Sequence, residues 1–472
     1  MAARVLSLLA KHKLLLVIAI AIGLRLVALV AFRQHFAYSE PGGVIHGSVA
    51  YDDYALNLLE TGVYGREAGA PDAGLPPLYS YVIAAIYSIF ERHYLAVAAL
   101  HILFDALSIA LLYDISRRLF PRPAHRGDWI GALAGLFFAL YPYLIFQNLT
   151  LNDTALWILL LHLFVWLLIR LRERATYDRG TLALAVAAGL ALGISALARA
   201  LLPPLAILAG LWFLLKLSPR ETLRRLLPVA IVSLLAPLPW LLRSYDIYDG
   251  FVPIALNSGE NIYQGNNPYA AAVFRAGYDV QWLPAPPDAP PTDAPLQRNA
   301  FLAEAGWRYL RENPADALDL IFLKLLVSWN PQVTPLRNLR QGEKLSVDET
   351  GAVLIVSGEG SHVGVTAANA AYQDDSLFNV IGRNLHIVYF GGAWLLAITG
   401  VWLSRRHWRM LSLLVFVQIS QTLVYLLFHP STRYRSPTDP LLFVFSAVAV
   451  VWVVGWLMPL SRSFRPSSRN PR

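Results

Sequence analysis

Two adjacent acids, Asp52 and Asp53, are the first residues whose type and spacing suit chemistry. Helical spacing over 51–60 gives an apolar face of Tyr51, Ala55, Leu58 and Leu59, and an opposite face of Asp53, Asn57 and Glu60 with Asp52 beside it. A third acid, Asp153, begins an apolar segment. Acids gathered at the edge of apolar segments suit an enzyme that works at a membrane face. The alternative is that they only cap helix N-termini or oppose the helix dipole.

Composition defines the setting of these acids. Of the 472 residues 56% are hydrophobic and 15% are charged, and the mean hydropathy is +0.47. Soluble domains carry about 25% charged residues, so an ordinary soluble, disordered or fibrous protein is excluded. Cysteine is absent, which excludes disulfides and thiolate chemistry. The sequence therefore predicts an all-α polytopic membrane protein.

Ten apolar segments are long enough to span a bilayer. They are 14–32, 93–116, 128–147, 153–170, 180–198, 201–217, 226–243, 385–403, 409–428 and 439–460. The shorter segment 78–90 follows Pro76-Pro77, and we expect it to lie at the membrane surface. With this choice more than half of the 39 Lys and Arg residues fall in short segments on one side, together with both termini. The positive-inside rule makes that side cytoplasmic. The net charge of +8 is thus a topology signal, and no nucleic-acid partner is expected.

The spans divide the chain into three predicted parts. Residues 1–243 form a membrane module of seven spans with a first outer loop at 33–92, residues 244–384 form an extracytoplasmic loop region, and residues 385–472 form a module of three spans and a cytoplasmic tail. In the large loop, 298–311 and 315–329 read as amphipathic helices, and 345–375 suggests a small hairpin. The role of the insertion at 333–380 is open. Within the spans, Arg25 and Asp105 are expected to pair, because lone charges are costly in lipid.

Several segments, in this order, resemble the GT-C glycosyltransferases of the family 39 type. These enzymes use polyprenyl-phosphate sugars and include protein O-mannosyltransferases and lipid A aminoarabinose transferases. The resemblance covers most of the chain and lies in DYALNLLETGVYG (53–65), GLPPLYSYVIAAIYSIF (74–90), YPYLIFQNLTLNDTALWILLL (141–161), GLALGISALARALLPPLAIL (189–208) and FHPSTRYRSPTDPLLFVFSA (428–447). No single motif is strong, but their order and spacing together are specific.

The resemblance implies an inverting transfer of a monosaccharide from a polyprenyl-phosphate donor to an acceptor hydroxyl on the periplasmic or extracytoplasmic face of the inner or plasma membrane. It places the catalytic carboxylate on Asp53, slightly favoured, or Asp52, with Asp153 as a second acid near the sugar. The Asp-Asp pair departs from the more usual Asp-Glu or single Asp, so the base stays open between them. A divalent cation, Mg²⁺ or Mn²⁺, at Asp52, Asp53 and Asp153 is also left open. The donor sugar and the acceptor, whether protein, lipid or glycan, are not readable.

A lipid-phosphate leaving group needs cationic and hydrogen-bonding side chains around it. The candidates for donor binding are Arg199, Arg243, Lys324, His429, Arg433, Tyr434 and Arg435. The segment 429–435 is the best of these, because its two Arg residues on the outer face run against the positive-inside trend. The candidates for sugar or acceptor binding are Tyr263, Asn266 and Asn267, which form a tight turn in the alternative interpretation.

Two other functions remain open from the sequence. A transporter or glycolipid flippase would show inverted repeats and broken helices, and we see no repeat. A polysaccharide polymerase or ligase would need a similar phosphate-binding Arg set, and the sequence does not exclude it.

Overall fold

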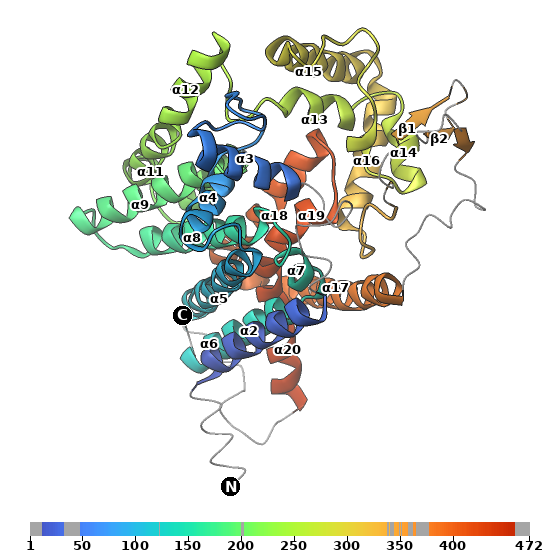
Figure 1. Cartoon of the computed structure of the whole chain (residues 1–472). Helices are drawn as coiled ribbons and strands as arrows, with labels where there is room; N and C mark the ends of the chain where they lie inside the picture. The colour runs from blue at the N-terminus through green and yellow to red at the C-terminus, as the bar shows by residue number, and fades with distance from the viewer. Residues whose placement is uncertain are drawn as a thin grey trace.

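The computed structural model describes residues 12–32, 48–121, 123–199, 203–337, 339, 344–348, 350, 352–356, 362–364 and 377–457. The elements are almost all helical (Figure 1). The helices of the first part are α2 (Lys13–Ala31), α3 (Ser48–Thr61), α4 (Leu78–Phe90), α5 (Tyr94–Leu119), α6 (Ala124–Leu140), α7 (Pro142–Gln147), α8 (Thr154–Glu173), α9 (Arg179–Ala196), α10 (Pro203–Leu214), α11 (Pro219–Leu235) and α12 (Leu238–Tyr248).

The remaining elements begin in the large loop. They are α13 (Ser258–Gly265), α14 (Ala270–Ala276), η2 (Val280–Trp282), α15 (Pro295–Glu312), α16 (Pro314–Trp329), β1 (Lys344–Val347), β2 (Val353–Val356), β3 (His362–Gly364), α17 (Leu377–Leu403), η4 (Arg405–His407), α18 (Trp408–Leu427), α19 (Thr432–Arg435), η5 (Ser436–Thr438) and α20 (Asp439–Leu457).

Among the described residues, eight helical segments are long and apolar enough to cross a membrane. They contain α2, α5, α8, α9, α11 with α12, α17, α18 and α20. The other two predicted spans correspond to α6, of 17 residues, and α10, of 12 residues. The polytopic all-α class is therefore confirmed, while the number ten stays a prediction. Helix α4 has 13 residues, roughly 20 Å, which is too short to span.

Helices α8 and α20 form the centre of the membrane part, because 72% of the apolar 18-residue stretch of each is buried. Helix α20 packs on α6 and α17, and α8 packs on α5 and α9. Gly400 allows the close contact of α17 with α20, since a Cβ there would lie 1.9 Å from the carbonyl oxygen of Phe445. This packing fixes the start of α20, and with it the segment 431–439 that precedes and begins the helix.

A buried ion pair joins α2 to α5, as the sequence predicts. The guanidinium of Arg25 donates to Asp105, and both side chains are 1% exposed. Asn148, just after α7, donates to the other carboxylate oxygen at 2.6 Å. The pair is compensated on both oxygens, which is the condition under which a buried charge is tolerated.

The large loop forms a separate group of helices and strands on one side of the molecule (Figure 1). The predicted amphipathic helices are confirmed as α15 and α16, each with a proline in its first turn, where the missing N–H costs nothing. The suggested hairpin is a three-stranded antiparallel sheet in the order β1-β2-β3, with Leu345 opposite Ile355. These two residues are buried in one apolar cluster with Leu320 of α16.

Candidate functional site

A cavity of about 590 Å³ lies between the membrane helices and the large loop. One part of its wall is apolar and comes from the end of α2, from α7 and from α17: Ala28, Phe32, Ile145, Phe146, Ile381 and Leu385. The other part is polar: Gln147, Asp279, Gln281, Arg383, His386, Ser431, Arg433 and Tyr434. The cavity therefore suits a ligand with a hydrocarbon part and a charged or polar part.

Arg433 is the cation of this cavity that stands out. It has no hydrogen bond or ion pair with any residue that the structure describes, and its Nε is buried without a partner. The buried pair of Asp153 and Arg199 is near enough for both of its charges to act on it, as are the hydroxyls of Tyr51 and Tyr434. A guanidinium without a direct partner can bind an anion that enters the cavity, because its donors are not used by other protein groups.

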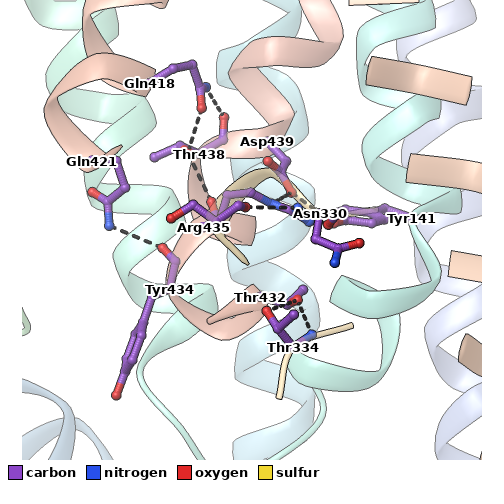
Figure 2. A network of polar contacts seen from close by, with 11 residues as sticks. Tyr141, Asn330, Thr334, Gln418, Gln421, Thr432, Tyr434, Arg435, Thr438 and Asp439 are labelled. Carbon is purple, nitrogen blue, oxygen red and sulfur yellow. Dashed lines mark hydrogen bonds and ion pairs between the residues drawn. The ribbon is translucent and has the colours of Figure 1, made fainter. Parts of the chain in front are cut away.

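Arg435, two residues away, has several direct partners (Figure 2). It donates to the Tyr141 hydroxyl at 3.2 Å and to the backbone carbonyl of Asn330 at 3.1 Å, and it pairs with Asp439 at 3.4 Å. Its guanidinium also lies 3.5 Å from the ring centroid of Phe390. Arg435 thus joins protein elements to each other, and Figure 2 shows Tyr434 pointing away from it.

Asp153 and Arg199 form a buried two-pronged ion pair. Arg199 Nε and Nη2 lie 2.5 and 2.7 Å from the two Asp153 carboxylate oxygens. Asp153 occupies the N-cap position of α8, but its side chain makes no capping hydrogen bond. Tyr51 lies within reach of both charges: burial raises its pKa, Asp153 raises it further, and Arg433 and Arg199 lower it. The pair therefore lies next to the cavity, although neither residue is among those lining it.

Asp52 and Asp53 point in different directions from α3. Asp52 is buried and accepts from the Tyr87 hydroxyl at 2.7 Å and from Arg92. Asp53 is 34% exposed and pairs with Arg66 at 3.4 Å. Neither is among the cavity-lining residues.

The predicted cation site is not assembled by these acids. No group of three or more His, Asp or Glu side chains able to hold a metal ion is found in the part of the chain that the structure describes. Asp52, Asp53 and Asp153 each face an Arg instead. A bound cation therefore stays a prediction.

Arg243 and Lys324 hold the chain together outside the cavity wall. Arg243 donates to the backbone carbonyls of Tyr64 and Asp72 at 2.5 and 2.9 Å, and so fixes the first outer loop to α12. Lys324 is fully buried and donates to Asn266 Oδ1 at 2.8 Å and to the carbonyl of Leu426 at 3.0 Å. Burial lowers the Lys324 pKa to about 7.

The residues proposed for sugar or acceptor contact form a turn. Asn266 donates to the carbonyls of Ile262 and Leu427, and Asn267 donates to the carbonyl of Tyr263. Gly265 allows this turn to pack on the C-terminal end of α18, since a Cβ there would lie 2.0 Å from the Phe428 carbonyl oxygen. The turn interpretation accounts for the contacts of Asn267, whereas Asn266 also contacts Leu427 and Lys324.

Asp279 is a cavity residue that the sequence analysis missed. It is 5% exposed, and its Oδ1 lies 3.6 Å from His429 Nδ1. Burial lowers the pKa of His429, which disfavours the charged imidazolium, and the predicted role of His429 in donor binding stays a prediction. No sequence signal marks Asp279, because it lies in an irregular loop far along the chain from the spans it meets.

Comparisons with known proteins address the fold. A profile of the dolichyl-phosphate-mannose-protein mannosyltransferase family matches residues 75–242. The oligosaccharyltransferase AglB of Archaeoglobus fulgidus, in complex with an inhibitory peptide and a dolichol-phosphate, aligns with a TM-score of 0.55 at 14% identity, over 98% of this chain and 52% of that chain. The chain has the GT-C fold. The resemblance seen in the sequence is thereby confirmed.

Two further solved structures align with the chain to different degrees. The A. fulgidus oligosaccharyltransferase tethered with an acceptor peptide gives a TM-score of 0.54 at 15% identity, over 98% of this chain and 52% of that chain. ArnT from Cupriavidus metallidurans bound to undecaprenyl phosphate gives 0.41 at 14% identity, over 94% and 79%. The chain spans about half the length of the oligosaccharyltransferase structures. No curated protein matches the sequence.

The segments that match the family profile and the segments that form the cavity wall are mostly different. Residues 75–242 run from the start of α4 into α12 and include Asp153 and Arg199. Arg433 and Asp279 lie outside that region. The polar wall of the cavity is therefore built largely by segments that the family profile does not cover.

Proposed function

We propose that this protein is an integral-membrane inverting glycosyltransferase. It transfers a monosaccharide from a polyprenyl-phosphate donor to an acceptor hydroxyl on the extracytoplasmic face of the inner or plasma membrane. The AglB structure that shares its fold contains a dolichol-phosphate, a lipid of the proposed chemical class. The orientation rests on the placement of the basic segments, which makes the large loop extracytoplasmic.

The observation that carries the proposal is the unpaired guanidinium of Arg433 in an amphiphilic cavity. Polyprenyl chains are hydrocarbon, and the apolar wall formed by Phe32, Phe146 and Leu385 offers them a matching surface. The phosphate would then meet Arg433, whose planar fork of donors fits phosphate oxygens.

The chemistry follows from this placement. The acceptor oxygen attacks the anomeric carbon from the face opposite the phosphate, and the bond from that carbon to the phosphate oxygen breaks. Negative charge develops on the departing phosphate, where Arg433 stabilises it more strongly than in the ground state. Attack from the opposite face inverts the configuration at the anomeric carbon.

The test uses the purified full chain in nanodiscs with a panel of polyprenyl-phosphate monosaccharides and candidate acceptors. We expect release of free polyprenyl phosphate with at least one donor. The variant Arg433→Gln should weaken donor binding or turnover by at least tenfold, because a charge-assisted contact to phosphate contributes about 1.5–3 kcal/mol. The matched control is Arg405→Gln, an exposed arginine at the other end of α18.

The outcomes separate the candidate functions. Donor binding and turnover that need Arg433 but not Arg405 support the transferase. If the wild-type protein is folded but binds no such lipid, the proposal is contradicted and the transporter function is favoured. Equal loss in both arginine variants would mean that Arg433 has no special role in donor binding.

A further inference from the structure

His386 of α17 is a buried imidazole in the wall of the large cavity. It is 1% exposed, and neither Nδ1 nor Nε2 has a hydrogen-bond partner among the residues that the structure describes. By contrast, the buried imidazoles of His101 and His162 each have at least one hydrogen bond to another residue. Buried polar atoms without partners lower the stability of a fold, and native proteins satisfy nearly all of them. The two free nitrogens of His386 therefore point to a partner that enters the cavity.

Aromatic neighbours hold the His386 ring in place. The ring of Phe390, one turn further along α17, is stacked on it with centroids 5.7 Å apart and planes 4° apart. The ring of Tyr141 is stacked at 5.6 Å and 20°. These contacts fix the plane of the imidazole and use neither of its nitrogens. The orientation of the ring thus comes from packing, while its hydrogen-bonding capacity stays available.

Helix α17 contributes to both the apolar and the polar part of the cavity wall. Ile381 and Leu385 are one turn apart, belong to the apolar part and are half-exposed at the surface of the membrane helices. Gly382 and His386 form the adjacent row, about 100° further round the helix. A Cβ at Gly382 would meet no atom within 4 Å, so the space next to His386 is open. His386 therefore lies where the two parts of the wall meet, as the phosphate of a polyprenyl phosphate lies where hydrocarbon and polar groups meet.

Tyr143 of α7 connects His386 to Arg433. Its ring centroid lies 5.6 Å from that of His386, and its hydroxyl is near enough to Arg433 for the guanidinium charge to act on it. All three side chains line the cavity. An anion bound by Arg433 is thus placed in the part of the cavity to which His386 also belongs.

We infer that His386 donates a hydrogen bond to the phosphate of the polyprenyl-phosphate donor, an inference that rests on the proposed function. An imidazole carries at least one N–H donor in either protonation state. Arg433 supplies the positive charge, and His386 supplies a directed donor from a membrane helix outside the region that matches the family profile. His386 is then a specificity-determining residue, because it distinguishes a lipid phosphate from an uncharged lipid in the same cavity.

The test measures binding of two probes to the full chain in nanodiscs: a polyprenyl phosphate and the polyprenol of the same length. His386→Phe keeps an aromatic ring in the stack but removes both nitrogens. We expect it to weaken binding of the polyprenyl phosphate by about tenfold to a hundredfold, the usual effect of losing a hydrogen bond to a charged group. Binding of the polyprenol should not change. The unfolding temperature without lipid should stay equal or rise, because two buried atoms without partners are removed.

The matched control is His162→Phe in α8, where the buried imidazole lies outside the cavity wall. It should leave the affinity for both lipids unchanged. His386→Asn and His386→Gln restore an N–H donor without the ring, so at least one of them should bind the polyprenyl phosphate more tightly than His386→Phe does.

The results distinguish this inference from the proposed function. If His386→Phe binds the polyprenyl phosphate as tightly as wild type does, the inference is wrong and the proposed function stands. If it loses affinity for the phosphate and the polyprenol equally, His386 shapes the apolar wall and the inference is also wrong. A lower unfolding temperature of His386→Phe, with no recovery of binding in the Asn and Gln variants, would assign His386 a structural role only. If folded wild type binds no polyprenyl phosphate, the proposed function itself fails and the inference fails with it.

Discussion

The buried cationic side chains of this protein differ in which groups compensate their charge. This difference distinguishes cations that stabilise the fold from a cation that is available to bind a ligand. Arg25 and Arg199 face carboxylates, Lys324 faces only neutral oxygens, and Arg433 faces the cavity. Burying a charge opposite neutral acceptors lowers the stability of the fold. A buried guanidinium without a protein partner is compensated only when an anionic ligand binds to it. The sequence predicted the Arg25–Asp105 pair because two opposite charges in apolar spans have few other partners.

The Lys324 pKa leads to a prediction about pH. Its pKa is about 7 in the folded chain, against 10.5 ordinarily, because burial disfavours the charged form. Between these values the unfolded state binds more protons, so stability rises with pH, by at most about 1.4 kcal/mol per unit. The cost of burial is fully present below pH 7. We therefore expect wild type to gain stability relative to Lys324→Met from pH 7 to pH 9.5, measured by denaturant unfolding in detergent.

The control for this prediction is Lys344→Met in β1, where the lysine is exposed. Its stability curve should run parallel to that of wild type over the same pH range. If the Lys324→Met curve also runs parallel to wild type, Lys324 does not titrate in this window and its charge must be compensated differently.

At the scale of elements, Arg435 connects the C-terminal end of α16, the residue before α7 and the start of α20. Replacing it by Gln leaves the Asp439 carboxylate, which is fully buried, without its cation. Breaking a buried pair from one side costs roughly 3–5 kcal/mol. We expect Arg435→Gln to lower the thermal unfolding temperature clearly, while Arg433→Gln, two residues away, leaves it near that of wild type.

The double variant Arg435→Gln/Asp439→Asn provides the matching check, because it removes the orphaned charge. Its unfolding temperature should recover in part. Equal unfolding temperatures for Arg433→Gln and Arg435→Gln would contradict the division of roles between these two arginines.

Elements were predictable from the sequence where the hydrophobic period is decisive, whereas only part of the cavity wall was, namely Arg433 and Tyr434. Helices α4, α15 and α16 appear where apolar spacing and proline place them. Asn57 was expected on a polar face of α3, yet it is buried because its amide donates to the carbonyls of Gly65 and Glu67. Arg433 and Arg435 have the same surroundings in sequence, and only the packing around α19 separates them. Asp279 depends entirely on long-range packing.

At the scale of the whole molecule, the proposed function requires one orientation in the membrane. The large loop closes the cavity on one side. An extracytoplasmic acceptor can therefore reach the cavity only if this loop is extracytoplasmic. The basic residues at the opposite helix ends, such as Arg220 and Arg405, would then be cytoplasmic. Orientation and site are thus linked, and a test of one constrains the other.

The absence of cysteine makes this orientation directly measurable. Single cysteines at Asp288, exposed in the large loop, and at Arg220, exposed at the start of α11, give one probe for each side. In intact spheroplasts a membrane-impermeant maleimide should label Asp288→Cys, and it should label Arg220→Cys only after permeabilisation. Labelling in the reverse order would place Arg433 and Asp279 on the cytoplasmic face. The donor would then have to be used on the side where it is synthesised, and an extracytoplasmic transferase would be excluded.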